Sequence, residues 1–128
     1  MREIAKALQL YYDNNNAYPS TGGQWYCLGH GTAGQCWAGG YSGSDALDAS
    51  LAPYISKVPD DPLNRTSGYG DAYMYNSSYP TSAGTGAVVH WGIEKSNPTS
   101  ADCAGGYLDN WGAGNGIGGN YYCILLIR

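Results

Sequence analysis

Four cysteines are the residues of this chain whose spacing points most directly to chemistry. Cys27 and Cys36 have eight residues between them, in a segment dominated by glycine and polar side chains. Such a segment buries too little apolar surface to hold one shape, so a covalent link is a natural restraint. Zinc is the alternative, but paired zinc ligands usually stand about two to four residues apart, and His30 is the only imidazole nearby. We therefore expect a Cys27–Cys36 disulfide.

Cys103 and Cys123 are the second candidate pair, with nineteen residues between them. A bond between them would close the glycine-dominated segment Glu94–Asn120 onto the apolar run Tyr121–Ile127. For a loop of this size the chain-entropy estimate of the stabilisation is about 3 kcal/mol. Four cysteines still permit three connectivities, which the sequence alone does not separate. Any of them favours an oxidising compartment outside the cytosol.

Other reactive residue types do not form a catalytic pattern. The segment Gly114–Gly119 contains G-x-G-x-x-G, but no strand leads into it and no helix follows, so it does not predict a nucleotide site. Asp60 and Asp61 are adjacent between prolines and indicate a turn. His30 and His90 have no second ligand at metal spacing, and His90 is expected to be a satisfied or surface strand histidine. We predict that the protein is not an enzyme.

Composition limits the remaining classes of function. The chain has 128 residues, which suits one domain with a modest core. Charged residues make up only 12%, and the net charge is −4 with no basic run, so nucleic-acid binding is not expected. There are 20 glycines and 13 tyrosines but no phenylalanine. Aromatic residues with polar groups suit half-exposed sheets and loops.

The first element that must position these residues is a helix over residues 1–14. Ile4, Leu8, Tyr11 and Tyr12 recur at helical spacing, and no glycine or proline interrupts them. The helix is expected to stop in the asparagine run at residues 14–16, because asparagine favours turns. A helix this short is marginal in water. Its apolar stripe therefore needs a partner surface.

Two segments resemble type IV pilins and type II secretion pseudopilins. The order R-x-x-x-x-A-L-x-x-Y-Y-x-x-N-x-x-Y-P, from Arg2 to Pro19, is similar to the lower half of their long first helix. The run YISKVPDDPL, from Tyr54 to Leu63, is similar to the segment that precedes the sheet in many pseudopilin-like proteins. The resemblance covers about the first half of the chain, and the second half agrees only in general pattern.

The remaining elements follow from turn and strand signals. Residues 20–44 form a glycine-rich loop, and Ser44 is expected to cap a short helix over residues 45–56, which Pro53 breaks or tightens. Three strand-like runs lie within residues 72–127, and their long polar connections favour an antiparallel sheet: Ala72–Ser77, Ala87–Ile93 and Tyr121–Ile127. A helix on a small antiparallel sheet is an α+β fold. It matches the pilin fold that the resemblance implies.

The resemblance implies a structural subunit of a helical filament, assembled from copies of itself or with related subunits. The filament core would contain the first helix, with Ile4, Leu8, Tyr11 and Tyr12. Pilins also carry an apolar half-helix that this chain does not include, and it would anchor the subunit in the inner membrane, facing the periplasm, before assembly. Met1 would then be an added start residue; the alternative is that Met1 is natural and the protein is soluble. The expected location is extracellular or at the cell surface, and the resemblance leaves pilus and secretion pseudopilus open.

The resemblance bears on two further sites. Pilins commonly tie a C-terminal loop to the sheet with a disulfide, which agrees with Cys103–Cys123. Major pseudopilins hold calcium between late strands, and oxygen donors are available in the matching region, although their spacing fits no fixed pattern. These calcium candidates are Glu94, Asn97, Asp102 and Asp109. The Cys103 disulfide is the alternative restraint there.

A secreted binding module or adhesin is the alternative function. Trp25, Trp37 and Trp111 lie in glycine-rich loops, where their rings could stack on a glycan or on a partner protein. The two functions are compatible, because a filament subunit can also be an adhesin.

Overall fold

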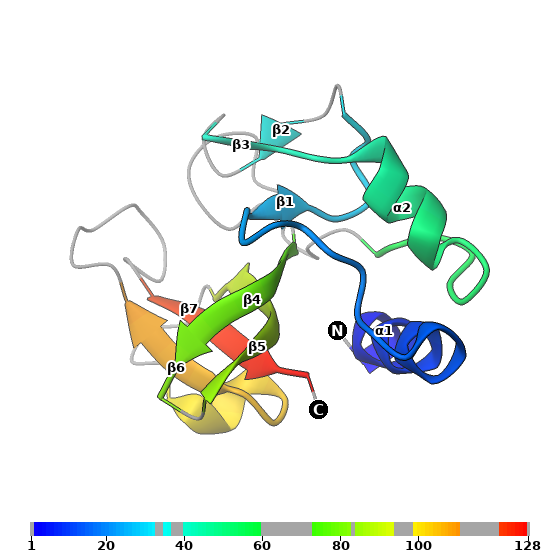
Figure 1. Ribbon diagram of the computed structural model, residues 1–128. Coiled ribbons are helices and arrows are strands. Elements are labelled where there is room, and N and C mark those ends of the chain that lie inside the picture. Colours follow the sequence, from blue (N-terminus) through cyan, green and yellow to red (C-terminus); the bar gives the residue numbers. More distant parts are fainter. Residues whose placement is uncertain are drawn as a thin grey trace.

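Two α-helices, a short 3-10 helix, a five-stranded antiparallel sheet and a smaller two-stranded sheet form the described part of the computed structural model, shown in Figure 1. The structure describes residues 2–32, 35–36, 40–59, 73–82, 84–93, 99–110 and 121–127. In chain order the elements are α1 (Arg2–Asn15), β1 (Tyr26–Cys27), β2 (Gln35–Cys36), β3 (Tyr41–Ser42), α2 (Asp45–Leu51), β4 (Met74–Thr81), β5 (Gly84–Gly92), the 3-10 helix η1 (Ser100–Cys103), β6 (Tyr107–Asn110) and β7 (Tyr121–Leu126). The predicted α+β class, with an N-terminal helix and a small antiparallel sheet, is confirmed.

The five-stranded sheet has the order β1-β4-β5-β7-β6, and every neighbouring pair is antiparallel. The predicted strands correspond to β4, β5 and β7. The expectation of long connections between them is wrong for β4 and β5, whose pairing continues to Thr81 and Gly84. A tight hairpin joins this pair because Gly84 has a φ of 126°, which a residue with a side chain rarely adopts.

The register gives the sheet two distinct faces. Directly paired residues share a face, and successive residues alternate between faces. The pairs Tyr75↔Val89 and Trp91↔Cys123 lie on the face that packs against α1, which we call the helix face. Met74 pairs with His90, and His90 pairs with Ile124, on the opposite face, which we call the outer face.

The apolar stripe of α1 packs against the helix face, as predicted. Ile4 and Leu8 are 1% and 0% exposed and belong to one buried cluster with Tyr75, Val89 and Trp91. Figure 1 shows α1 to one side of the sheet, with α2, β2 and β3 gathered above it. Burying one large aliphatic side chain contributes roughly 1.5–3 kcal/mol, so this contact supplies the stability that an isolated short helix lacks.

The asparagine run ends α1 through hydrogen bonds to the last turn. The side-chain amides of Asn14 and Asn15 donate to the carbonyls of Leu10 and Tyr11, each at 2.9 Å. Asn16 has a φ of 56°, a left-handed conformation that asparagine tolerates better than most residues. Beyond this turn, the buried Tyr75 hydroxyl donates to the carbonyl of Pro19 at 2.8 Å and ties the exit of α1 to the sheet.

The second helix is shorter than the predicted range 45–56. The hydroxyl of Ser44 accepts a hydrogen bond from the Leu47 N–H at 3.2 Å, which confirms the predicted N-cap. Regular α-helix ends at Leu51, and the N–H of Tyr54 then bonds to the Leu51 carbonyl in a tighter turn. Pro53 explains the change, because proline has no N–H to continue the helix.

The segment Glu94–Asn120 contains structure that the sequence pattern did not predict. The 3-10 helix η1 and strand β6 both lie in it, and β6 extends the sheet by pairing with β7. Cys103 is completely buried, and Leu108 packs against the same cluster as α1. Residues 99–110 therefore contribute to the same core that receives α1. Among the described helices, none is long and apolar enough to cross a membrane.

Candidate functional site

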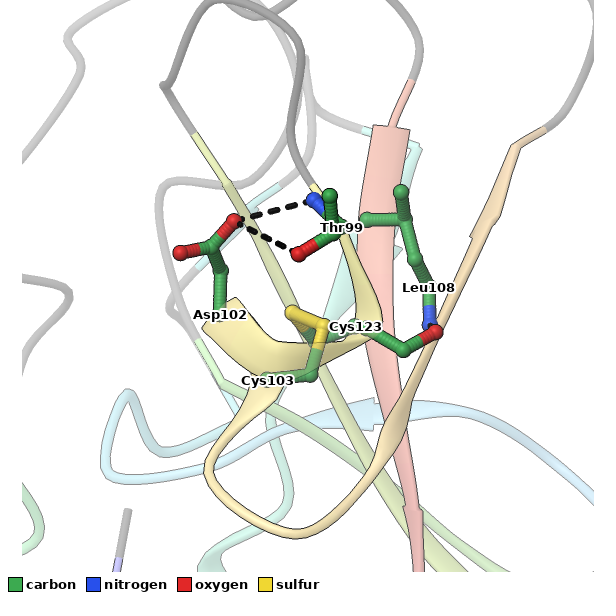
Figure 2. Close-up of a disulfide and its surroundings, with 6 residues drawn as sticks. Thr99, Asp102, Cys103, Leu108 and Cys123 are labelled. Carbon is green, nitrogen blue, oxygen red and sulfur yellow. Dashed lines mark hydrogen bonds between the residues drawn. A yellow bond between two sulfur atoms is a disulfide. The ribbon is translucent and has the colours of Figure 1, made fainter.

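The Cys103–Cys123 disulfide joins η1 to the helix face of β7 (Figure 2). Both residues are 0% exposed and belong to the cluster that receives α1. Around the bond, the N–H of Gly106 donates to the Cys103 carbonyl at 2.8 Å, and the N–H of Leu108 donates to the Ser100 hydroxyl at 3.0 Å. These contacts order the turn between η1 and β6. Of the three connectivities that the sequence leaves open, the structure has Cys27–Cys36 and Cys103–Cys123.

The calcium candidates do not form a cation site within the described residues. Glu94 and Asn97 lie outside the described residues. The carboxylate of Asp102 accepts the Thr99 N–H at 2.9 Å, so it caps η1, as Figure 2 shows. Asp109 lies on β6 and is exposed. No group of three or more metal-ligating side chains occurs among the residues that the structure describes, and the calcium prediction stays untested.

The Cys27–Cys36 disulfide lies on the outer face. Cys27 pairs with Met74 of β4, and these residues form a small buried cluster with Cys36. Trp25 and Tyr122 pack against this cluster as partly buried residues. The outer face is therefore covered by a short stretch of the glycine-rich loop, whereas the helix face is covered by a complete helix.

Two carboxylates of α2 also hold the glycine-rich loop. Asp48 accepts the N–H groups of Gly29 and Gly31 through its two oxygens, each at 2.9 Å. Asp45 accepts the N–H of Thr32 at 2.9 Å, and the Thr32 hydroxyl accepts the N–H of Asp45 at 3.0 Å. Both acids also lie in the first turn of α2, where the helix dipole favours negative charge. Their second role could not be read from spacing, because the loop donors lie 13 to 19 residues away.

Four aromatic rings form a row on the outer face. The indole of Trp25 stacks on the His90 imidazole, with centroids 4.1 Å apart and planes 10° apart. The Tyr79 ring lies edge-on to Trp25 with centroids 4.8 Å apart, and the Tyr122 ring lies edge-on to His90 with centroids 5.2 Å apart. Among the predicted binding tryptophans, Trp25 is half-buried in this row. Trp37 and Trp111 lie outside the described residues.

The row is an apolar environment for its titratable members. Both ring nitrogens of His90 are shielded from solvent, and burial lowers its pKa to about 3. Burial also raises the pKa of Tyr122 to about 12, with a smaller contribution from the negative charge of Asp109. His90 is therefore neutral at physiological pH. It is half-buried with both ring nitrogens shielded, so the expectation of a surface histidine is wrong.

The opposite side of α1 faces away from the sheet. Arg2, Glu3 and Lys6 are exposed there. Tyr12 lies one turn after Leu8, at the edge of the apolar stripe, and is 40% exposed with its ring 4.8 Å from that of Tyr18. Ile4 and Leu8 are covered by the sheet, and Tyr11 is half-buried against the Tyr54 ring. Of the four residues predicted for a filament core, Tyr12 is thus the one whose side chain is largely accessible to another molecule.

Comparisons of the chain with family models, with curated proteins and with solved structures find no match. Function is therefore argued from the residues and the geometry described above.

Proposed function

We propose that this protein is a non-enzymatic structural subunit of a helical filament, a pilin or pseudopilin assembled at the cell surface or across the periplasm. The observation that carries this proposal is the arrangement of α1. The segment with the pilin-like sequence order packs one side on the sheet and leaves its other side exposed. An amphipathic helix used in this way can join subunits without disturbing the core of each one.

The exposed side of α1 has the chemistry of a contact between like subunits. Arg2 and Lys6 carry positive charge, and Glu3 carries negative charge, within one helical turn of each other. Opposite charges on the same short face can pair between neighbouring copies that are displaced along a filament axis. Tyr12 adds a large exposed ring at the edge of the apolar stripe, and tyrosine is favoured at interfaces because it combines apolar area with a hydroxyl.

The sheet and its disulfides would give each subunit a stable, outward-facing body. Both disulfides are compatible with the oxidising surroundings of a surface filament. The Cys103–Cys123 bond fixes η1 and β6 to β7, which leaves fewer ways for the chain to loosen when a filament is pulled. In this arrangement the apolar N-terminal half-helix of pilins would precede α1 and supply the membrane anchor.

The binding-module alternative depends on tryptophans with accessible ring faces. Of the three candidate tryptophans, Trp25 is the one in the described part of the chain, and one face of its ring is covered by His90. A sugar stacks on an open ring face, so Trp25 does not favour this alternative over the filament. A glycan-binding screen of the folded protein tests it directly.

Site-specific photocrosslinking in the native cells tests the filament proposal. A benzophenone amino acid replaces Tyr12 in the full natural chain, and a matched variant carries it at Tyr41, which is equally exposed at 42%. We expect a ladder of crosslinked copies from position 12, because α1 would lie among the helices of neighbouring subunits. The Tyr41 variant controls for crosslinks that come from crowding alone. Absence of a ladder from position 12, with normal abundance of the protein, would contradict the proposal.

A further inference from the structure

The imidazole of His90 lies beneath the indole of Trp25 at the centre of the outer face. His90 is on β5, the middle strand of the five-stranded sheet. The Trp25 ring covers it in a parallel stack at 4.1 Å, and the Tyr122 ring closes one edge at 5.2 Å. Both imidazole nitrogens are shielded from solvent by this arrangement. Water can reach the ring nitrogens only if a covering side chain moves.

The described side chains that surround His90 on the outer face are mostly uncharged. The side chains on the surrounding strands are Met74 and Tyr79 from β4, Ile124 and Tyr122 from β7, and Tyr107 and Asp109 from β6. Asp109 is the one carboxylate among these side chains, and its charge acts on Tyr122 from an exposed position. Burial is the cause that lowers the pKa of His90. The Trp25 face offers a cation–π attraction, which favours keeping the stack.

The segment that carries Trp25 has a hinge on one side and anchors on both. Gly22 and Gly23 have φ of 63° and 80°, and a β-carbon added at either would lie in open space. Before the hinge, the Thr21 N–H donates to the Ser77 hydroxyl at 2.8 Å. After Trp25, strand pairing holds Cys27 opposite Met74 of β4, and the disulfide links Cys27 to Cys36. The Gly23 carbonyl also accepts the side-chain amide of Asn76 at 2.9 Å, and Tyr26 pairs with Tyr75 of β4. Movement is therefore confined to Gln24 and Trp25, while the residues on both sides stay attached to the sheet.

We propose that protonation of His90 releases Trp25 from the outer face, while α1 and the helix face stay packed. The proton comes from solvent, and water then hydrates the imidazolium. At neutral pH the Trp25 indole covers His90 on the outer face. At acid pH, with His90 protonated, the outer face exposes the indole together with the rings of Tyr79 and Tyr122. This pH-dependent surface is independent of the filament proposal, because it concerns the side of the sheet opposite α1.

Fluorine NMR of 5-fluorotryptophan-labelled protein tests the release. A His30→Gln background leaves His90 as the only histidine, so its ring protons report its protonation directly. Trp25 is assigned by loss of its signal in Trp25→Phe, and Trp91, on the helix face, serves as the internal control. As the pH falls we expect the Trp25 signal to move to a solvent-exposed position together with His90 protonation. Trp91 should keep its folded position through that range.

The matched variant is His90→Phe, which keeps an aromatic ring under Trp25 but cannot take a proton. In this variant Trp25 should stay packed down to the pH at which Trp91 also reports unfolding. If His90→Phe folds poorly, His90→Gln supplies a second non-titrating comparison. Three results would overturn the proposal: a stack that persists on protonated His90, a Trp25 movement that is unchanged in the variants, or Trp25 and Trp91 moving together.

Discussion

The two faces of the sheet differ in what covers them, although their residues alternate along the same strands. On the helix face, α1, the Cys103–Cys123 bond and residues from β4, β5 and β7 form one continuous cluster. On the outer face, the buried apolar group is small, and a loop with glycine hinges covers a titratable ring. The helix face therefore carries the stability of the domain. The outer face is the part that can change without unfolding the rest.

The largest expected effect comes from the helix face. Leu8→Ala removes a completely buried side chain from the contact between α1 and the sheet. We expect the free energy of unfolding to fall by about 2–5 kcal/mol, because the cavity cannot close fully. Urea denaturation measures this loss, and Leu10→Ala, at a half-buried position on the same helix, is the control. Equal losses in the two variants would show that α1 does not depend on its apolar stripe.

Removing each disulfide in turn should show that the two bonds stabilise different faces of the sheet. Replacing Cys103 and Cys123 together by alanine should cost about 3 kcal/mol in unfolding free energy, from the chain-entropy estimate for a loop of 20 residues. Replacing Cys27 and Cys36 should cost somewhat less, about 2.5 kcal/mol for a separation of nine. Hydrogen exchange should show general loss of protection in the first variant and loss confined to the outer face in the second. The reverse pattern would contradict the division of roles between the faces.

The acid dependence of stability should come in part from the outer face. His90 has a folded pKa of about 3, below the value of about 6.5 in an unfolded chain, so the unfolded state binds the proton first. The stability that neutral His90 contributes to the folded state is fully present above pH 6.5 and is lost as the pH falls toward 3. At pH 5 the free energy of unfolding should be lower by about 2 kcal/mol. Urea denaturation across this range, with His90→Phe as reference, isolates the effect. If Trp25 is released, the fall of unfolding free energy with pH should become less steep once the form with Trp25 released is populated. Identical pH profiles for the natural chain and His90→Phe would show that His90 does not cause the effect.

The loop that covers the outer face should depend on α2. Asp48→Ala removes the acceptor of two loop N–H groups, and we expect a loss of about 1–2 kcal/mol. Asp48→Asn keeps an acceptor oxygen for one of them and should lose less. Faster exchange of the Gly29 and Gly31 amides is the local measurement. A loss of stability without faster exchange at these amides would mean that Asp48 acts only through the helix dipole.

The sequence was most informative where one pattern runs over several turns or residues. The helical spacing of Ile4 and Leu8 predicted both α1 and its packing, because a stripe of that width must be buried. Ser44 predicted the start of α2, since its capping role is local. The runs that gave β4, β5 and β7 were likewise long enough to recognise.

Short elements and long-range contacts could not be predicted in the same way. Strand β6 has four residues and exists through its pairing with β7 and the adjacent disulfide, neither of which its own residues specify. The stack of Trp25 on His90 depends on the register between β4 and β5 and on the path of a glycine-rich loop. The sequence identified Trp25 as notable but assigned it to an open binding loop, because burial is set by tertiary structure.

The central claim is that α1 joins copies of this protein into a filament. Cryo-electron microscopy of filaments isolated from the native cells tests it most directly, with mass spectrometry to identify the subunit. We expect filaments built from this chain, with the α1 helices packed along the axis, Tyr12 between neighbouring subunits, and the outer face of the sheet toward solvent. Recovery of the protein only as free monomers, or filaments in which α1 lies at the periphery, would contradict the claim.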